Sequence, residues 1–359
     1  AHTDDVHLTK NLTMTEQAAI DVADAIEADL GTYGVRFVFQ SIQSANDTSL
    51  VSAGRRGGLF SVTNAYLRKS DTSLVPLQTM AGIYRIGNSA EADFSSINNA
   101  VQALQTNGVS GWVTFEIEDG TYYEQFSIAA IAGTQDWDNR PITFRSLSND
   151  STKVIIQYSP TQGSNNYIFK NDGVKNLIFE KLHFVNTSSI LGRVFNNNAV
   201  SKNFILRNCI VEGEYSAPAT IDNDLLFSTA QLSGATITNN VFKNGNRALY
   251  LLGSNITINS NKFYGHKNYA ISFGTVAAMP NVIGNDIYGP STGTFSGISM
   301  GSATDKFIVE KNKIINQLVP GIVGINCSFS AIGGVVAADN ALVANNEISM
   351  LAGSTTIGM

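Results

Sequence analysis

The sequence predicts an all-β solenoid, in which short strands stack coil upon coil into a parallel β-helix. Two observations predict it. First, one short pattern recurs along the chain: an apolar run, an Asn, any residue, then Ile or Phe. Its Asn residues are 32, 21, 24, 27 and 34 residues apart. Between these phrases, alternate residues such as Ile256 and Ile258 are apolar. One coil cannot bury such a face alone, but a stack with about 4.8 Å between coils can. The recurring residues are Asn208, Asn240, Asn261, Asn285, Asn312 and Asn346.

The recurring Asn is expected at the same bend of every coil. Asn tolerates a left-handed backbone conformation better than most residues. Its side-chain amide can also donate to and accept from the Asn of the next coil. The sequence therefore predicts a structural Asn ladder. Because Leu182 occupies the Asn position one coil earlier, we expect the ladder to begin at Asn208.

An amphipathic helix is predicted ahead of the first regular coil. Asp93 is its candidate N-cap and Asn107-Gly108 its end. An open solenoid end exposes core residues and unpaired strand edges, so this helix is interpreted as an N-terminal cap. Its apolar face has spacings of 3, 4 and 3: Phe94, Ile97, Val101 and Leu104.

Residues 1–80 differ in sequence pattern from the rest of the chain. Their pattern predicts a small α+β module, or the tail of a preceding domain. A helix is expected after a capping box at 13–16, followed by strands at 35–40, 59–67 and 74–77. Residues 81–359 form the predicted β-helix. Because no capping pattern follows Asn346, we expect the helix to continue beyond Met359, or another domain or chain to cover its last coil.

Composition narrows the function classes. Hydrophobic residues make up 43% of the chain and charged residues 14%, which suits a large buried core. The net charge of −6 and the lack of a long basic run argue against a nucleic-acid partner. No apolar run approaches the roughly 20 residues of a membrane span. Cys209 and Cys327 fall in distant predicted coils, so both thiols are expected to be free.

Three segments carry a family resemblance: GIYRIGNSAEADFSSINNAVQAL (82–104), GVSGWVTFEIEDGTYYEQFSI (108–128) and RPITFRSLSNDSTKVII (140–156). Together with the Asn-marked coils, they resemble the secreted right-handed parallel β-helix proteins of Bacteroidetes. These proteins belong to the pectate-lyase/pectinesterase-like superfamily. The resemblance covers about 83–359. It implies right-handed coils, secretion or cell-surface display, and export by the type IX route.

The enzymes of this superfamily have catalytic sets that the sequence does not reproduce. Gly120, Tyr122 and Glu124 match the G-x-Y-x-E motif of pectinesterases, which implies a structural role. The paired aspartates that should follow on a central strand are missing. Leu191-Gly192-Arg193 begins like the later pectinesterase arginine motif, but Val194 replaces its Pro-Trp continuation. Gly265-His266-Lys267 matches only two residues of the polygalacturonase Gly-His-Gly.

The strands that carry catalysis in these relatives align here as 248–252, 270–273, 297–300 and 321–325. With Leu249, Ile271 and Ile298 pointing inward, the outward set includes Tyr250, Ser272 and Ser299. These side chains cannot supply a paired acid and base. We therefore predict no catalytic residue.

A polar and aromatic cluster follows the Asn phrases. Its aromatic faces and its amide and cationic donors would suit an acidic glycan, although a solvated turn flank is the more common origin of such a cluster. Its members are Lys243, Asn246, Arg247, Lys262, Tyr264, His266, Lys267 and Tyr288. Asp222 and Asp224 are a candidate calcium pair, or simply part of a loop. No other cofactor is expected.

Together these patterns predict a secreted or cell-surface module that binds carbohydrate, such as a polysaccharide or a cell-surface glycan, or mediates adhesion. The alternative is a polysaccharide lyase or glycoside hydrolase with a non-standard site that uses Lys243, Arg247, Lys262 or His266. A phage tail-spike-like protein is a third reading.

Overall fold

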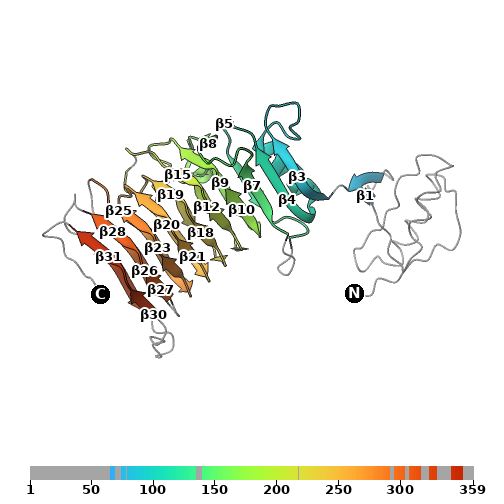
Figure 1. The fold of residues 1–359 in the computed structure, drawn as a ribbon. Helices are drawn as coiled ribbons and strands as arrows, with labels where there is room; N and C mark the ends of the chain where they lie inside the picture. The colour runs from blue at the N-terminus through green and yellow to red at the C-terminus, as the bar shows by residue number, and fades with distance from the viewer. Residues whose placement is uncertain are drawn as a thin grey trace, which may run out of the picture. The chain divides into compact units, whose positions relative to one another are not determined.

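The computed structural model describes residues 65–68, 74–77, 79–134, 140–216, 218–291, 295–303, 307–316, 323–329 and 341–350 (Figure 1). The chain divides into two compact units, Ala1–Thr79 and Met80–Met359. In the first unit, β1 (Ala65–Arg68) pairs antiparallel with β2 (Leu74–Leu77). The predicted helix after residue 16, the strand at 35–40 and the covering of the last coil lie outside the described residues.

The second unit is a right-handed parallel β-helix, which confirms the predicted fold class. Its strands visit three sheets in turn, and each sheet pairs every coil with the next (Figure 1). The ten-stranded sheet contains β3 (Met80–Ile86), β4 (Val109–Ile117), β7 (Ile142–Ser146), β10 (Leu177–Glu180), β14 (Ile205–Arg207), β18 (Thr236–Thr238), β21 (Thr257–Asn259), β24 (Asn281–Ile283), β27 (Phe307–Glu310) and β30 (Ala341–Ala344).

The other two large sheets complete each coil. The nine-stranded sheet contains β5 (Gly120–Tyr122), β8 (Val154–Tyr158), β11 (His183–Asn186), β15 (Ile210–Glu212), β19 (Val241–Lys243), β22 (Lys262–Tyr264), β25 (Asp286–Tyr288), β28 (Lys313–Asn316) and β31 (Glu347–Met350). The eight-stranded sheet contains β6 (Phe126–Ala129), β9 (Phe169–Asp172), β12 (Phe195–Asn197), β16 (Leu226–Ser228), β20 (Arg247–Ser254), β23 (Tyr269–Ala278), β26 (Ser296–Ala303) and β29 (Val323–Phe329). The other described elements are a short parallel pair, β13 (Ser201–Lys202) and β17 (Leu232–Ser233), two 3₁₀ turns, η1 (Gly163–Asn165) and η2 (Ile221–Asn223), and helix α3 (Ile97–Asn107).

The core lies inside the coils, where alternate strand residues stack on their counterparts one coil away. Phe115 stacks on Phe144 with ring centroids 4.6 Å apart, and Phe242 on Phe263 at 5.1 Å. All four rings are buried. Because the same inward position repeats in every coil, like side chains pack on like, and apolar area is removed from water along the whole stack.

A ladder of side-chain amides joins five coils at the bend between the ten- and nine-stranded sheets. In the first four members, the amide nitrogen donates to the amide oxygen of the Asn one coil on, at 2.9–3.0 Å. The same oxygen accepts the backbone N–H of the preceding Asn, as in Asn240 to Asn261 at 2.9 Å. The members are Asn240, Asn261, Asn285, Asn312 and Asn346.

Asn208 is not a member of the ladder, which corrects the sequence prediction. Cys209 occupies the position, and its backbone N–H donates to the Asn240 side chain at 2.8 Å. The backbone angle φ is 56° at Asn208 and 55° at Asn239, and both values lie in the left-handed region. The left-handed residue is therefore the one before the ladder position. In consequence, Asn208 serves the bend through its backbone, while the ladder begins one coil later at Asn240.

Helix α3 (Ile97–Asn107) caps the first coils and buries Ile97, Ala100, Val101 and Leu104. Its N-cap is Ser96, whose hydroxyl accepts from the N–H of Asn99 at 3.1 Å, so Asp93 is not the cap. Phe94 precedes the helix. Glu124 accepts the N–H groups of Ile97 at 2.9 Å and Asn98 at 2.8 Å. The last residue of the G-x-Y-x-E match thus stabilises the helix N-terminus.

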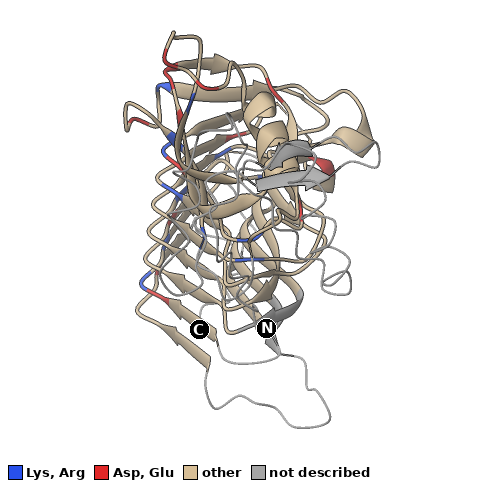
Figure 2. Ribbon diagram, turned by 90° about the vertical axis from the view of Figure 1, so that its right-hand side faces the viewer, with Lys and Arg blue, Asp and Glu red and all other residues tan. Residues whose placement is uncertain are grey.

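The remaining sequence expectations concern cysteines and charge. Cys209 and Cys327 are both free, and burial raises the pKa of the Cys209 thiol to about 12. None of the described helices is long and apolar enough to cross a membrane. Figure 2 shows basic and acidic residues in neighbouring coils, where they form cross-coil ion pairs such as Arg145 with Glu116 at 2.6 Å and Arg207 with Glu180 at 2.9 Å.

Candidate functional site

The eight predicted carbohydrate-binding residues do not form one surface. Four of them lie on the outer face of the nine-stranded sheet. There Lys243, Tyr264 and Tyr288 are partners in register, and Lys262 is two residues before Tyr264 on β22. The two tyrosine rings stack at 4.9 Å with an interplanar angle of 3°. Because the rings cover each other's faces, this stack offers mainly ring edges and hydroxyls to a ligand.

Asn246 and His266 are buried, which corrects their assignment to an exposed binding flank. Asn246 is 2% exposed and donates to Asp224 at 2.7 Å. His266 is 0% exposed and packs edge-on against Phe263 at 6.1 Å. Neither ring nitrogen of His266 has a hydrogen-bond partner among the described residues. It can therefore act neither as a surface ligand nor as a base that meets substrate. Lys267 lies in the turn between β22 and β23.

The buried imidazole gives an expected pH dependence. Burial lowers the pKa of His266 from 6.5 to about 4. The backbone carbonyls of Asn244 and Phe242 lie near the ring and oppose this shift only in part, because neither makes a well-formed hydrogen bond to it. Between these two values the unfolded chain binds a proton that the folded chain excludes, so stability falls as the pH falls. His266→Leu should abolish about 3 kcal/mol of acid destabilisation between pH 6.5 and pH 4, measured by urea unfolding at each pH. An unchanged pH slope in this variant would contradict the burial of a neutral ring.

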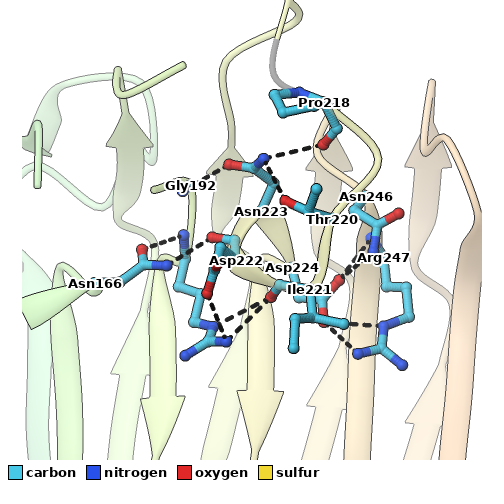
Figure 3. Close-up of polar contacts among 11 residues, drawn as sticks. Asn166, Gly192, Pro218, Thr220, Ile221, Asp222, Asn223, Asp224, Asn246 and Arg247 are labelled. Carbon is cyan, nitrogen blue, oxygen red and sulfur yellow. Dashed lines mark hydrogen bonds and ion pairs between the residues drawn. The ribbon is translucent and has the colours of Figure 1, made fainter. Parts of the chain in front are cut away.

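Arg247 lies on a different surface, at the start of β20 in the eight-stranded sheet, where three coils bring two arginines and two aspartates together (Figure 3). Arg193, Asp224 and Arg247 each stand two residues before an inward-facing residue of the sheet: Phe195, Leu226 and Leu249. The residue at this position is therefore charged in three successive coils.

Asp224 is the buried centre of this row, with 0% exposure. Its carboxylate accepts from Nε of Arg247 at 2.9 Å, from Nη2 of the same side chain, and from the Asn246 amide at 2.7 Å. Burial raises the pKa of Asp224, while Arg247 and Asn246 favour its ionised form. A two-point contact to a guanidinium is the strongest of these interactions, so the pair fixes Arg247 in one position.

Arg193 is held one coil earlier by a different set of acceptors. Its Nε and Nη2 donate to the carbonyl of Ile221 at 3.3 and 3.2 Å, and Nη2 also contacts Asp222 at 3.2 Å. The side chain of Arg193 is 12% exposed and that of Asp222 50%. For both Arg193 and Arg247, Nη1 has no hydrogen-bond partner among the described residues.

Two aromatic rings lie under these guanidinium groups. The Cζ atom of Arg193 is 4.0 Å from the ring centroid of Phe227, and that of Arg247 is 4.1 Å from the centroid of Tyr250. Phe227 stacks on Tyr250 at 5.3 Å. Guanidinium groups over aromatic faces gain cation–π attraction and lose mobility. We call Arg193, Phe227, Arg247 and Tyr250 the arginine–aromatic cluster.

Buried asparagines fix the backbone beneath the cluster. The amide of Asn166 accepts from Arg193 N–H at 3.0 Å and donates to the carbonyl of Asp222 at 2.7 Å (Figure 3). Asn223, 0% exposed, accepts from Gly192 N–H at 2.9 Å. A Cβ on Gly192 would stand 2.7 Å from that amide oxygen, so a larger residue would displace it. The cluster is thus held by polar contacts before any ligand arrives.

The candidate calcium pair is occupied by these contacts. Asp224 faces Arg247 and Asp222 faces Arg193. In the described part of the chain, no three His, Cys, Asp or Glu residues gather as a metal site. The two carboxylates are balanced by guanidinium groups, an arrangement that leaves a calcium ion few anionic oxygens to bind.

The outer face of the eight-stranded sheet continues the cluster in both directions. Leu249, Ile271 and Ile298 are fully buried, which confirms the predicted register of the outward residues. We call the outward line the outer row; its members are Lys170, Asn196, Phe227, Tyr250, Ser272 and Ser299. Sequence reasoning named the last three and missed the first three.

The outer row and the charged row beside it can present ring edges, hydroxyls and two guanidinium groups on one face. These groups can bind a polar ligand that carries apolar patches. Within the cluster, both aspartates are already paired with arginine, so the described geometry supports recognition more directly than proton transfer.

No protein-family model and no curated protein sequence matches the chain. Among solved structures, it is similar to the pectin methylesterase from Aspergillus niger in deglycosylated form, at 10% identity and a TM-score of 0.45, covering 74% of this chain and 92% of that one. It is also similar to Escherichia coli YbhC, at 10% identity and a TM-score of 0.41, covering 89% and 93%. At this identity the similarity concerns the fold, which the strand order already establishes.

Proposed function

We propose that this chain is a secreted or cell-surface β-helix module that binds carbohydrate along the outer face of the eight-stranded sheet. The observation that carries the proposal is the arginine–aromatic cluster, set within the outer row. Its four side chains come from three successive coils. Asp222 and Asp224 hold the two guanidinium groups, and Asn166 holds the backbone of Arg193. The resemblance to secreted β-helix proteins of Bacteroidetes supports the expected location and, with it, type IX export.

The chemistry of this surface suits a sugar chain. Phe227 and Tyr250 provide apolar edges for the C–H groups of a sugar ring, and Ser299, which is partly exposed, can bond to its hydroxyls. The Nη1 donors of the two arginines, which have no partner among the described residues, suit hydroxyl or carboxylate oxygens. Coils repeat at about 4.8 Å, close to the length of one pyranose unit, so a chain along the axis meets an equivalent position at each sugar.

A rigid surface also favours binding because little order is lost when the ligand arrives. The guanidinium groups are already oriented and largely buried, with 12% exposure of each side chain. Pre-organisation of this kind lowers the entropy cost of association. The outer row therefore supports a binding role, including adhesion to a polysaccharide-coated surface.

The second candidate is a polysaccharide lyase or glycoside hydrolase with a non-standard site. One observation favours it: Asp222 is half exposed beside Arg193, so its carboxylate is within reach of a ligand on the outer row. Of the side chains first considered for this chemistry, His266 is buried, and Arg247 is bound to Asp224.

A glycan array followed by calorimetric titration tests the proposal. Phe227→Ala and Tyr250→Ala should each weaken binding of the selected oligosaccharide at least about tenfold, because each removes a ring from the contact surface. Tyr123→Ala is the matched control, since Tyr123 is 74% exposed and lies outside the outer row. Equal affinity of all three variants would refute the proposed face. Release of unsaturated uronate ends by wild type, lost in Asp222→Asn, would favour the lyase instead.

A further inference from the structure

The connection from β15 to β16 runs along the helix axis before it enters the eight-stranded sheet. Tyr215 lies just after β15, and its hydroxyl is 3.1 Å from Oγ of Ser291, which follows β25. In the nine-stranded sheet, β15, β19, β22 and β25 are consecutive neighbours. This contact therefore spans three coil steps, about 14 Å at the usual strand spacing. We call residues 213–216 and 218–222 the axial loop.

The other end of the axial loop is fixed at the arginine–aromatic cluster. The carbonyl of Ile221 accepts both donors of Arg193, and Asp222 accepts a third contact from the same side chain. Asn223 bonds to the Pro218 carbonyl at 3.0 Å and to the Thr220 hydroxyl at 3.1 Å (Figure 3). The loop is thus tied to the body of the helix at two points, one on each side of its exposed middle.

Two large apolar side chains of this fixed loop remain exposed. Tyr215 is 63% exposed and Ile221 is 57% exposed. The loop connects the nine-stranded sheet to the eight-stranded sheet, and its fixed ends lie at Arg193, just before β12, and at Ser291, between β25 and β26. Both side chains belong to a loop that is fixed at its two ends, so they are available to a ligand at low entropy cost.

We infer that the axial loop is a specificity element of the outer row: Tyr215 and Ile221 flank a sugar chain that lies across Phe227 and Tyr250. This inference rests on the proposed function and names the residues that select chain length. A short oligosaccharide reaches only the cluster. A longer one that extends toward the turn after β25 also contacts Tyr215, which the bond to Ser291 holds in position.

The test compares short and long oligogalacturonates and cello-oligosaccharides as probes of the full chain. Tyr215→Ala should weaken the long oligomers about tenfold and leave the short ones unchanged. Tyr215→Phe and Ser291→Ala should each weaken the long oligomers about threefold, because each removes the same hydrogen bond. The double variant should be no weaker than either single variant, since the two changes act through one contact.

Phe227→Ala, in contrast, should weaken short and long oligomers alike. If Tyr215→Ala binds every oligomer as wild type does, the inference is overturned while the binding face stands. If wild type binds no oligomer of either series, both fall. Hydrogen exchange gives an independent readout: peptides covering 214–221 should exchange faster in Ser291→Ala without any ligand, and unchanged exchange would show that the bond does not hold the loop.

Discussion

Replacing Asn261 with Ala is expected to lower the free energy of unfolding by about 3–5 kcal/mol. The Asn261 oxygen accepts both the backbone N–H and the side-chain amide of Asn240, at 2.9 and 3.0 Å. Its own amide donates to Asn285 at 3.0 Å and to the carbonyl of Ile237 at 2.8 Å. Asn261 is 0% exposed, so water cannot replace these partners. Buried donors and acceptors on both neighbouring coils would be left unpaired.

The measurement is the urea midpoint and slope of the variant against wild type. Asn198→Ala is the matched control, because Asn198 is exposed and makes one long contact to Asp172 at 3.3 Å. The control should change stability by less than about 0.5 kcal/mol. If both variants behave alike, the ladder contributes little and the coils are held by their apolar core.

Replacing Asp224 with Ala is expected to cost a similar amount, about 3–5 kcal/mol, by a different mechanism. The substitution leaves the Arg247 guanidinium, whose side chain is 12% exposed, without its carboxylate. Asn246 loses its acceptor as well. Removing one member of a buried ion pair is more costly than removing both, because the remaining charge stays desolvated.

A double-mutant cycle separates this mechanism from simple loss of packing. The Asp224→Leu/Arg247→Met variant should recover most of the stability that Asp224→Ala loses, because no unpaired charge remains. Thermal unfolding of Asp224→Leu, Arg247→Met and the double variant gives the coupling energy. If the stability losses of the two single variants simply add in the double variant, Asp224 and Arg247 do not act as a pair.

The sequence predicts the fold well because two independent patterns indicate the coil repeat: apolar residues at the inward positions, and a recurring Asn. The predicted start of the Asn ladder at Asn208 is wrong by one residue, and the reason is physical. The left-handed residue and the ladder residue are adjacent, and both positions favour Asn, as Asn239 and Asn240 show. At Asn208-Cys209 only the first position is Asn, so the phrase matches while the ladder contact is absent.

The arginine–aromatic cluster was harder to predict because its members are brought together by coil length. Arg193, Asp224 and Arg247 are 31 and 23 residues apart, and the inserted axial loop obscures their register. A signal is nevertheless present: each stands directly before two buried apolar residues, Val194-Phe195, Leu225-Leu226 and Ala248-Leu249. A charged residue repeated at that position in successive coils predicts cross-coil pairing. No comparable sequence pattern predicts that His266 is buried.

The most direct test of the account is a crystal structure of the full chain with the oligosaccharide that it binds most tightly. The account predicts a sugar chain along the helix axis, with its rings against the edges of Phe227 and Tyr250 and its oxygens near Nη1 of Arg193 and Arg247. A ligand on the outer face of the nine-stranded sheet, against Tyr264 and Tyr288, would contradict the assignment of the binding face.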